Sequence, residues 1–341
     1  MRSKVALYHD DTQAWGLIEA DALMLLAKLP DACVDAIVTD PPYGIGLGGE
    51  AWDGRDIQRV ASAADGRLNA FEALERWTLC WAREARRVLK PGGHMVAFGA
   101  PRTFHRLTCG VEDAGLEIRD QLLWLNAQGL PKSRRLPGGL ATALKPAYEP
   151  ILLARAPLAG TAPANLAAWG TGALNIDAAR ITPSETPVGF WPANVTLSHA
   201  ASCQEGACQP DCPAALIDRE RTVLLPSRLF FAAKVPRRER EAGCEQVPER
   251  SVQLYTGKRH SPRVVRNAHP TVKPISLMRW LVRLICPPGG LVLDPFTGSG
   301  STGAAVVLED RLFLGVEREP EYVDIACARL THWAHKAGES S

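Results

Sequence analysis

The chain has 341 residues, of which 46% are hydrophobic and 22% are charged, and its formal net charge is +2. These values are ordinary for a globular protein with one large or two modest domains, and they exclude a fibre or a disordered tail. No apolar run is long enough to span a membrane, and no apolar signal-peptide core follows the first residues. We therefore expect a cytoplasmic protein without membrane association.

Charge is distributed unevenly along the chain. Residues 130–275 contain 19 Lys and Arg against 11 Asp and Glu, whereas the remainder contains 20 against 26. A basic middle on an acidic scaffold favours a polyanionic partner that meets one part of the molecule. A soluble Arg-rich region without such a partner is the alternative.

The amino-terminal part alternates strands with helices. A short strand at 16–19 ends near Asp21, and a helix through Leu23 and Leu29 follows. The next strand, at 36–39, is an apolar run that stops at a pair of prolines.

The four residues after that strand are Asp40, Pro41, Pro42 and Tyr43. Open α/β sheets place their chemistry at the carboxyl ends of strands. Because proline has no N–H, the carbonyls of Asp40 and Pro41 are left to accept hydrogen bonds from a ligand. Acceptors beside the ring of Tyr43 suit a planar group with an exocyclic amine, such as a nucleobase. A rigid turn without a ligand is the alternative.

The alternation continues to about residue 155 and then stops. The predicted elements are a helix at 71–89, a strand at 95–98, a helix at 104–112 and a hairpin of strands 118–125 and 148–153. The long connection at 126–146 favours a functional loop. Residues 156–266 are rich in Pro, Gly, Trp and Arg, which indicates an inserted region or a small separate domain before a helix at 275–285.

The carboxyl-terminal part reads as strand, glycine turn, helix, strand and helix. Strands at 291–294 and 312–316 enclose Gly298-x-Gly300-x-x-Gly303, and the second strand ends at Glu317. Glycines allow a ligand to approach the backbone, and a carboxylate in that place accepts from ribose hydroxyls. These features suit any adenosine cofactor, including NAD.

Only a helix, starting at Pro320, follows Glu317, so the remaining strands of this sheet must come from the amino-terminal part. The two carboxyl-terminal strands then act as strands one and two, and those at 16–19 and 36–39 as strands three and four. Strands one and four flank the topological switch point, where ligands bind. The sequence therefore predicts a Rossmann-like, doubly wound α/β sheet that is circularly permuted, with the glycine turn and Asp40 facing one crevice.

The order of these motifs resembles the beta group of amino-group DNA methyltransferases. Asp40-Pro-Pro-Tyr43, the His269-Pro-Thr-x-Lys-Pro block, Asp294-Pro-Phe-x-Gly-x-Gly300 and Lys90-Pro-Gly-Gly are all similar to motifs of such enzymes. The resemblance implies a catalytic half at 1–155, a target-recognition region at 156–266 and an S-adenosylmethionine-binding half at 267–341.

The resemblance also implies roles for single residues. Asp40, Pro41, Pro42 and Tyr43 are expected to hold the amine of a flipped-out base. Seven residues are expected around S-adenosylmethionine: Phe296, Gly298 and Gly300 in its pocket, Asp294 near the methionine amine, Glu317 at the ribose, Asp21 at the adenine amine and Lys273 near the methionine carboxylate. A helix cap is the alternative for Asp21, and a structural cap for Lys273.

The expected reaction is methylation of adenine N6 in double-stranded DNA. Adenine is preferred because the family usually has Asp or Asn at the first motif position for adenine and Ser for cytosine. Methylation of cytosine N4 is the closest alternative, followed by an NAD-linked oxidoreductase and a noncatalytic DNA-binding protein. A homodimer is left open.

The middle region carries three further hypotheses. His199, Cys203, Cys208 and Cys212 suggest a structural zinc site, with reduced loop cysteines as the alternative. Trp169, Phe190 and Trp191 are expected in the core, with insertion into the gap left by a flipped base as the alternative. Eight basic residues are candidates for phosphate contacts or, less often, guanine contacts, with a solvated face as the alternative for each: Lys234, Arg237, Arg238, Arg240, Lys258, Arg259, Arg263 and Arg266.

Overall fold

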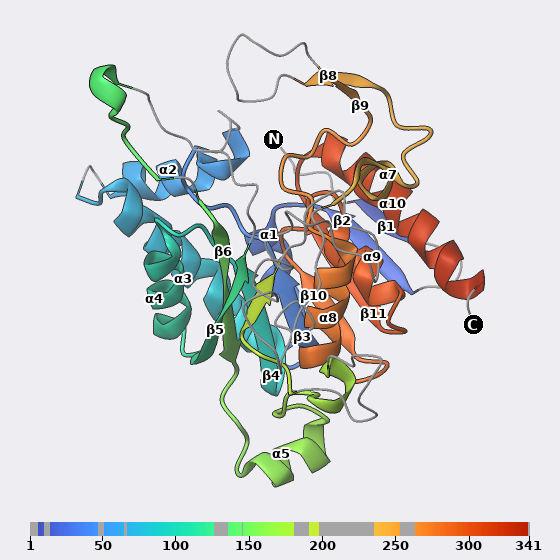
Figure 1. The fold of residues 1–341 in the computed structure, drawn as a ribbon. Coiled ribbons are helices and arrows are strands. Elements are labelled where there is room, and N and C mark those ends of the chain that lie inside the picture. Colours follow the sequence, from blue (N-terminus) through green and yellow to red (C-terminus); the bar gives the residue numbers. More distant parts are fainter. Residues whose placement is uncertain are drawn as a thin grey trace, which may run out of the picture.

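The computed structural model describes residues 6–9, 14–46, 51–64, 67–125, 136–144, 146–180, 191–197, 235–252 and 263–339. The strands of its main sheet are β1 (Ala6–His9), β2 (Trp15–Glu19), β3 (Val34–Thr39), β4 (Leu89–Phe98), β5 (Glu117–Leu125), β6 (Tyr148–Arg155), β7 (Val195–Leu197), β10 (Leu291–Asp294) and β11 (Leu312–Glu317). Their spatial order is β1-β2-β11-β10-β3-β4-β6-β5-β7 (Figure 1).

Strands from the two ends of the chain interleave at the centre of this sheet. β10 pairs in parallel with β11 on one side and with β3 on the other, and β2 pairs in parallel with β11. β10 and β3 are thus neighbours although about 250 residues separate them. This arrangement confirms the predicted sheet and places the switch point between β10 and β3.

Helices cover both faces of the sheet. They are α1 (Ala22–Leu26), α2 (Arg55–Ala63), α3 (Ala70–Val88), α4 (Phe104–Asp113), α5 (Ala162–Trp169), α7 (Arg237–Glu241), α8 (Ile275–Ile285), α9 (Ser301–Val307) and α10 (Pro320–Glu339). α3 begins at a capping box formed by Asn69 and Glu72. β3 is buried on both faces, because Ala36 and Val38 pack with α8 while Ile37 packs with α1 and α3.

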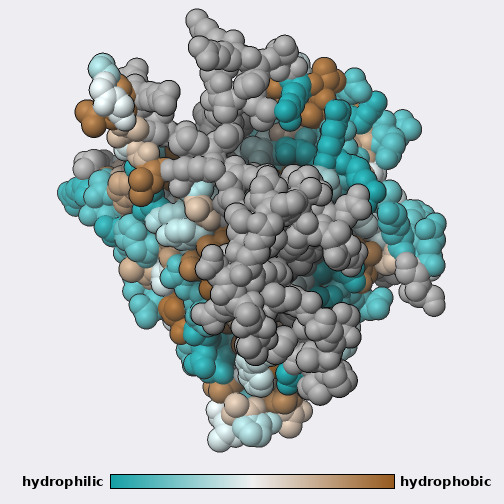
Figure 2. All heavy atoms as spheres, in the orientation of Figure 1, coloured by the Kyte–Doolittle hydropathy of each residue, from teal (hydrophilic) through white to brown (hydrophobic). Residues whose placement is uncertain are grey.

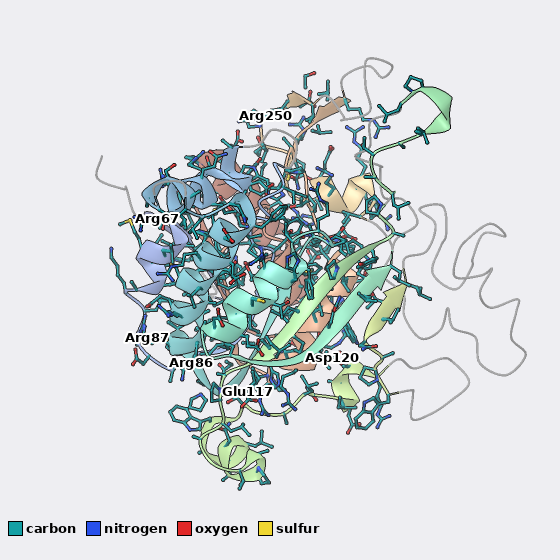
Figure 3. All side chains as sticks on the ribbon, turned by 90° about the vertical axis from the view of Figure 1, so that its left-hand side faces the viewer. Arg67, Arg86, Arg87, Glu117, Asp120 and Arg250 are labelled. Carbon is teal, nitrogen blue, oxygen red and sulfur yellow. The ribbon has the colours of Figure 1, made fainter. Side chains whose placement is uncertain are left out.

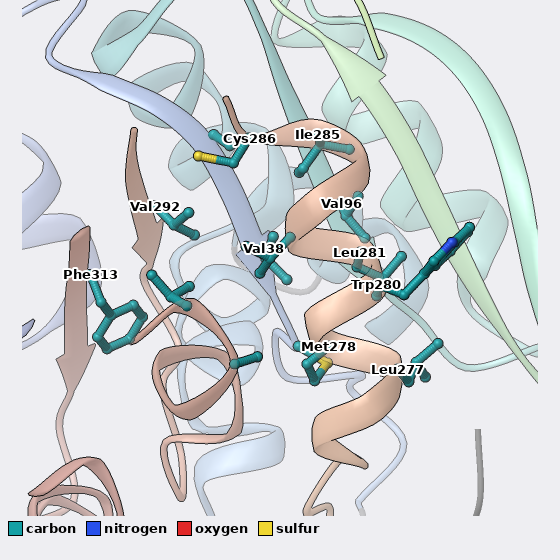
Figure 4. Close-up of a cluster of buried hydrophobic side chains, with 14 of the residues drawn as sticks. Val38, Val96, Leu277, Met278, Trp280, Leu281, Ile285, Cys286, Val292 and Phe313 are labelled. Carbon is teal, nitrogen blue, oxygen red and sulfur yellow. The ribbon is translucent and has the colours of Figure 1, made fainter. Parts of the chain in front are cut away.

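Figure 4 shows the core on the face covered by α8. Met278, Leu281 and Ile285 of this helix lie over Val38 and over Val96 and Val292 in the neighbouring strands. All six side chains are at most 3% exposed. The apolar stripe of α8 therefore ties the β3–β10 junction to the rest of the sheet, which fixes the strand ends that carry the candidate site.

Several elements differ from the sequence prediction. β1, α2 and β7 are additional, and β4 starts at Leu89 instead of Met95. The early start of β4 follows from a register shift in its pairing with β3, which admits Gly92 at a φ of 75°. Short edge strands such as β1 and β7 have weak sequence patterns, because pairing along one edge needs little apolar alternation.

The segment after residue 155 packs on the main sheet. Asn165 of α5 donates to the carbonyls of Pro91 and Thr171, which fastens α5 to the start of β4. β7 adds to the outer edge beside β5, and Trp280 of α8 donates to the carbonyl of Ala179. A role of residues 156–266 in target recognition stays a prediction.

A second, smaller sheet lies at one end of the molecule. It consists of β8 (Arg250–Val252) and β9 (Arg263–Val265), and it stands near α7 and α10 (Figure 1). Figure 2 shows hydrophilic side chains over this flank. Within the described ranges, no helix is both long and apolar enough to cross a membrane.

Candidate active site

A cleft opens at the carboxyl ends of β10, β11 and β3, where open α/β sheets bind their ligands. Its lining includes eight of the eleven residues predicted for the site: Asp21, Asp40, Pro42, Lys273, Asp294, Phe296, Gly298 and Glu317. The structure therefore brings the two halves of the predicted site to one crevice.

The other three predicted residues lie just behind the cleft wall. Pro41 continues the backbone from Asp40, and the ring of Tyr43 packs against the core on the α8 face. Gly300 begins α9 and lies against Ala326 of α10. The Tyr43 ring therefore does not present its face to the cleft in this structure.

The glycine turn after β10 is shaped by left-handed backbone. Gly298 has a φ of 54° and Gly300 a φ of 78°. A Cβ on Gly298 would lie 2.7 Å from Nε2 of His269, so a side chain there would both strain the backbone and displace the imidazole. The turn therefore brings its main chain to the cleft surface.

Asp294, at the end of β10, joins this turn to β3. Its Oδ1 accepts from the hydroxyl of Thr39 at 2.7 Å and from the N–H of Phe296 at 3.1 Å. Burial raises the pKa of Asp294 to about 6, although the hydrogen bonds from Thr302, Thr39 and Phe296 oppose the shift. A carboxylate so placed can accept from a ligand ammonium group.

Glu317, at the end of β11, organises the opposite wall of the cleft. Its Oε2 accepts from the N–H of Gly298, and its Oε1 accepts from the N–H groups of Arg318 and Glu319, each at 2.8 Å. Burial raises the pKa of Glu317 to about 7. Three backbone donors orient both oxygens and occupy three of the about four acceptor positions of the carboxylate, so the remaining one, on Oε2, is held in a fixed frame at the cleft wall.

Asp40 follows β3 directly and is held by two side-chain donors. Tyr43 donates its hydroxyl to Oδ1 at 2.5 Å, and Lys273 donates Nζ to Oδ2 at 2.5 Å. Lys273 also lies 3.4 Å from Glu149 of β6. Burial would lower the pKa of Lys273, but the carboxylates of Asp40 and Glu149 outweigh it and raise the pKa. Lys273 is thus a partner of Asp40, and a neighbour of the methionine carboxylate only as a prediction.

Asp21 caps the helix that follows it, as the alternative interpretation held. Its side chain accepts from the N–H of Met24, and Oδ2 lies 3.4 Å from Arg318. Arg318 in turn contacts Asp56 of α2 at 2.7 Å. The cap also lies in the cleft wall, so capping and contact with an adenine amine are compatible.

Aromatic rings line the cleft on two sides. His269 stacks on Trp52 with 6.0 Å between ring centroids and meets the edge of Tyr322 at 4.5 Å. Burial, followed by the nearby Lys273, lowers the pKa of His269 to about 3, so this ring is neutral at pH 7. On the other side, Phe296 packs against Trp77 at 5.4 Å. These rings provide flat apolar surfaces for a heterocyclic ligand.

Sequence reasoning missed Asp53, which shapes the loop after the proline pair. Its carboxylate accepts from the N–H groups of Tyr43, Gly44 and Ile45 at 2.7, 3.1 and 3.1 Å, and its side chain is buried. Trp52-Asp53 after a Gly-rich stretch was the available signal. An acidic residue with three backbone donors fixes the position of Tyr43 and, through it, that of Asp40.

Replacing Asp53 with Ala should lower the methyl-transfer rate about 10- to 100-fold, because three backbone donors lose their acceptor and Tyr43 is released. Cofactor affinity should stay within about twofold, since the three N–H groups that Asp53 accepts from belong to the loop after the proline pair. Single-turnover kinetics and calorimetry measure the two quantities. The exposed Asp113→Ala serves as control, and an unchanged rate in Asp53→Ala would show that the loop needs no such anchor.

The structure describes only some of the residues for which the sequence suggested a role in the middle region. His199, Cys203, Cys208 and Cys212 lie outside the described residues, as do Phe190, Lys234, Lys258 and Arg259. Among the residues that are described, no three His, Cys, Asp or Glu side chains are arranged to hold a metal ion. Trp169 and Trp191 are 38% and 66% exposed, so the prediction that they are core residues is wrong. Trp169 is the last residue of the short helix α5, and the Trp191 ring instead lies under the guanidinium group of Arg180, 5.7 Å from the ring centroid.

Two of the basic candidates have structural roles. Arg240 donates to the carbonyls of Asn267 and His269, and Arg266 donates to those of Glu245 and Val247. The guanidinium group of Arg240 therefore supports the His269 block at the cleft, and that of Arg266 holds the segment from Glu245 to Glu249. Arg250 stands at the opposite end of the molecule from Arg86 and Glu117 (Figure 3) and pairs with Glu321.

The cleft fits S-adenosylmethionine by its shape and donor set. The left-handed turn at Gly298 leaves room that a side chain would fill, and Glu317 offers an oriented acceptor for hydroxyls. Asp294 offers an acceptor for an ammonium group, and the aromatic rings offer a face for adenine. These are the contacts that the donor and acceptor groups of this cofactor require.

Comparison with known proteins gives one consistent family. Residues 34–328 match the model of the DNA methylase family of N6 and N4 methyltransferases. The type II methyltransferase M2.DpnII of Streptococcus pneumoniae is 22% identical over 315 residues, which is 92% of this chain and 88% of the relative. M2.LlaDCHI of Lactococcus lactis subsp. cremoris is 22% identical over 318 residues, or 93% and 90%.

A solved structure shares the fold. The PvuII DNA methyltransferase, which is cytosine-N4-specific, aligns with 96% of this chain and 93% of its own at a TM-score of 0.57 and 17% identity. The family match covers both halves of the cleft, from β3 with Asp40 to α10. The chain belongs to the S-adenosylmethionine-dependent DNA methylases, the amino-group methyltransferases that act on adenine N6 or cytosine N4.

Proposed function

We propose that this DNA methyltransferase modifies the N6 amine of adenine at a specific site in duplex DNA. The observation that carries the proposal is the carboxylate of Asp40, which reaches the cleft that Gly298 and Glu317 also line. The family that this chain resembles usually has Asp or Asn at this position for adenine and Ser for cytosine. A carboxylate is also the stronger acceptor for an amine that gains positive charge.

Asp40 and Pro41 would prepare the nucleophile. An aromatic exocyclic amine is a poor nucleophile because its lone pair is delocalised into the ring. Hydrogen bonds from the NH2 group to the Asp40 carboxylate and the Pro41 carbonyl draw the nitrogen toward tetrahedral geometry and aim its lone pair across the crevice. The nitrogen gives up one proton after the new bond has formed. Pro42 fixes the backbone of the acceptors.

The opposite wall would hold the methyl donor. When bound, S-adenosylmethionine supplies an electrophilic methyl group. Glu317 would accept from the ribose hydroxyls, Asp294 from the methionine amine, and Asp21 from the adenine amine, while Phe296, Gly298 and Gly300 shape the pocket. Both proposed binding sites face one crevice because β10 and β3 are neighbours, which suits in-line transfer.

The target base would have to leave the DNA helix. The amine of a stacked base cannot approach Asp40, because the acceptors lie inside a cleft and not on a protruding surface. Tyr43 would support the flipped base if its ring turned away from the core, which requires release of its hydroxyl from Asp40. The two relatives are named type II methyltransferases, which favours a short defined recognition site.

Nucleoside analysis tests the choice of amine. DNA from a methylation-free host, treated with the enzyme and methyl-labelled S-adenosylmethionine, should yield labelled N6-methyladenine. Labelled N4-methylcytosine alone would refute adenine while leaving the family assignment intact. Sequencing of the same DNA would identify the recognition site.

A further inference from the structure

Both oxygens of Asp40 are already engaged by donors of the protein itself. Oδ1 accepts from Tyr43 and Oδ2 from Lys273, each at 2.5 Å. A carboxylate oxygen can accept a second bond, but the target amine needs Asp40 at close range and in the plane of its lone pairs. A bound amine must therefore replace or displace at least one of these donors.

Lys273 is the donor whose displacement has the larger consequence. Its side chain is only 6% exposed, so water can replace little of the interaction that its ammonium group loses when it leaves Asp40. The Nζ atom of Lys273 also lies 4.8 Å from the centroid of the Phe98 ring, which carries no charge. The carboxylates of Asp40 and Glu149 are the anions with which Lys273 pairs. A buried ammonium without an anion would be strongly unfavourable.

Glu149 is placed to receive that ammonium group. It lies on β6, opposite Trp124 of β5, and its Oε2 is 3.4 Å from Nζ of Lys273. A shift of roughly 0.6 Å would shorten this contact to the usual length of a charged hydrogen bond. Lys273 can thus exchange one carboxylate for the other with little motion of its chain.

Charge at the reacting nitrogen favours the arrangement in which Lys273 is paired with Glu149 and not with Asp40. Positive charge develops on the target nitrogen during transfer, so a cation beside Asp40 opposes the reaction and a free carboxylate favours it. With two carboxylates for one ammonium, the cluster of Asp40, Glu149 and Lys273 keeps one net negative charge. His269 adds no second cation, because burial and Lys273 hold its pKa at about 3.

We propose that Glu149 is a positioning residue that draws Lys273 away from Asp40, so that the Asp40 carboxylate is released to the target amine. The inference rests on the proposed role of Asp40 as the amine acceptor. It also gives the site a discrimination step. A base with an amine donates an N–H to Asp40 in place of the ammonium group of Lys273. A base with a carbonyl at the same position has no such donor, so the Asp40 carboxylate would face another acceptor.

The variant Glu149→Gln removes the charge and keeps the shape. Its single-turnover methyl-transfer rate should fall about 10- to 100-fold, while the dissociation constant for S-adenosylmethionine stays unchanged. Glu75→Gln is the matched control, because Glu75 is also a partly exposed partner of a cation, Arg106, but lies on the outer helices. An unchanged rate in Glu149→Gln would overturn the proposal.

A binding measurement separates positioning from a merely structural role. Duplexes that carry the recognition site with either adenine or purine, which lacks the 6-amino group, report how much the amine contributes to affinity. The dissociation constant of the purine duplex divided by that of the adenine duplex should be smaller in Glu149→Gln than in the wild type. The reason is that Lys273 stays on Asp40 in the variant, so the amine adds less to the affinity. The same ratio in both proteins would contradict the exchange.

A double-mutant cycle shows whether Glu149 acts through Lys273. In a Lys273→Met background, Glu149→Gln should change the single-turnover rate by less than about threefold, because there is no ammonium group to draw away. A full effect in that background would overturn the proposal. Asp40→Ala, which removes the acceptor, distinguishes the two levels: if it still transfers methyl efficiently, the role of Asp40 fails, and if it is inactive while Glu149→Gln is normal, only the exchange fails.

Discussion

Replacing Asp40 with Ala is expected to reduce methyl transfer at least about 1,000-fold while the affinity for S-adenosylmethionine changes little. The carboxylate is the proposed acceptor of the target amine, and it contributes to alignment and to charge stabilisation in the transition state. Its contacts run to Tyr43 and Lys273 and not to the glycine turn. Single-turnover transfer of labelled methyl and calorimetric binding measure the two effects.

The variant Asp40→Asn shows whether a loss of activity in Asp40→Ala is caused by misfolding. Removal of the whole side chain leaves the ammonium group of Lys273 with only Glu149, whereas Asn keeps the volume and one acceptor oxygen. Asp113→Ala, on an exposed part of α4, should behave as wild type. Substantial residual transfer in both Asp40 variants would remove Asp40 from the mechanism.

Replacing Glu317 with Ala is expected to weaken S-adenosylmethionine binding about 100-fold. Two contributions combine: the loss of the acceptor proposed for the ribose hydroxyls, and the loss of the partner of three N–H groups that shape the cleft wall. Calorimetry measures the affinity, and Glu321→Gln on the exposed side of α10 is the control. Wild-type affinity in Glu317→Ala would contradict the assignment of the cofactor site.

The same residue should make cofactor binding depend on pH. Burial raises the pKa of Glu317 to about 7 from its usual value of 4.5, so the free protein holds this proton where the unfolded chain has lost it. The contribution of Glu317 to stability therefore falls as the pH rises from about 4.5 to 7. Binding favours the ionised carboxylate, so affinity should rise between pH 6 and 8, and Glu317→Gln should flatten this slope.

The sequence predicted which candidate residues would lie together because they stand at strand ends. Asp40, Asp294 and Glu317 each end a buried apolar run, and parallel strands bring such ends to one edge of a sheet. The shortage of strands after Glu317 then required β2 and β3 to complete the sheet. The β3–β10 pairing confirms that reasoning.

The sequence could not predict hydrogen-bond and ion-pair partners that only the three-dimensional fold brings together. Asp53 and Glu149 carry no motif of their own, and their roles depend on distances across the fold: Asp53 to three N–H groups of the loop, and Glu149 to Lys273. Lys273 itself was identified, but its partner Asp40 is more than 230 residues away in the chain. The same limitation explains Arg240 and Arg266, whose charge pointed to DNA while their geometry points to backbone carbonyls.

We expect the target amine and the methyl donor to meet between β3 and β10. This can be tested with a crystal structure of the enzyme bound to duplex DNA carrying its site and to an unreactive analogue of S-adenosylmethionine. That structure should show a flipped adenine whose N6 lies within hydrogen-bond distance of Asp40 and the Pro41 carbonyl, with the ribose of the analogue on Glu317. A base held elsewhere, with Asp40 still bound to Lys273, would contradict it.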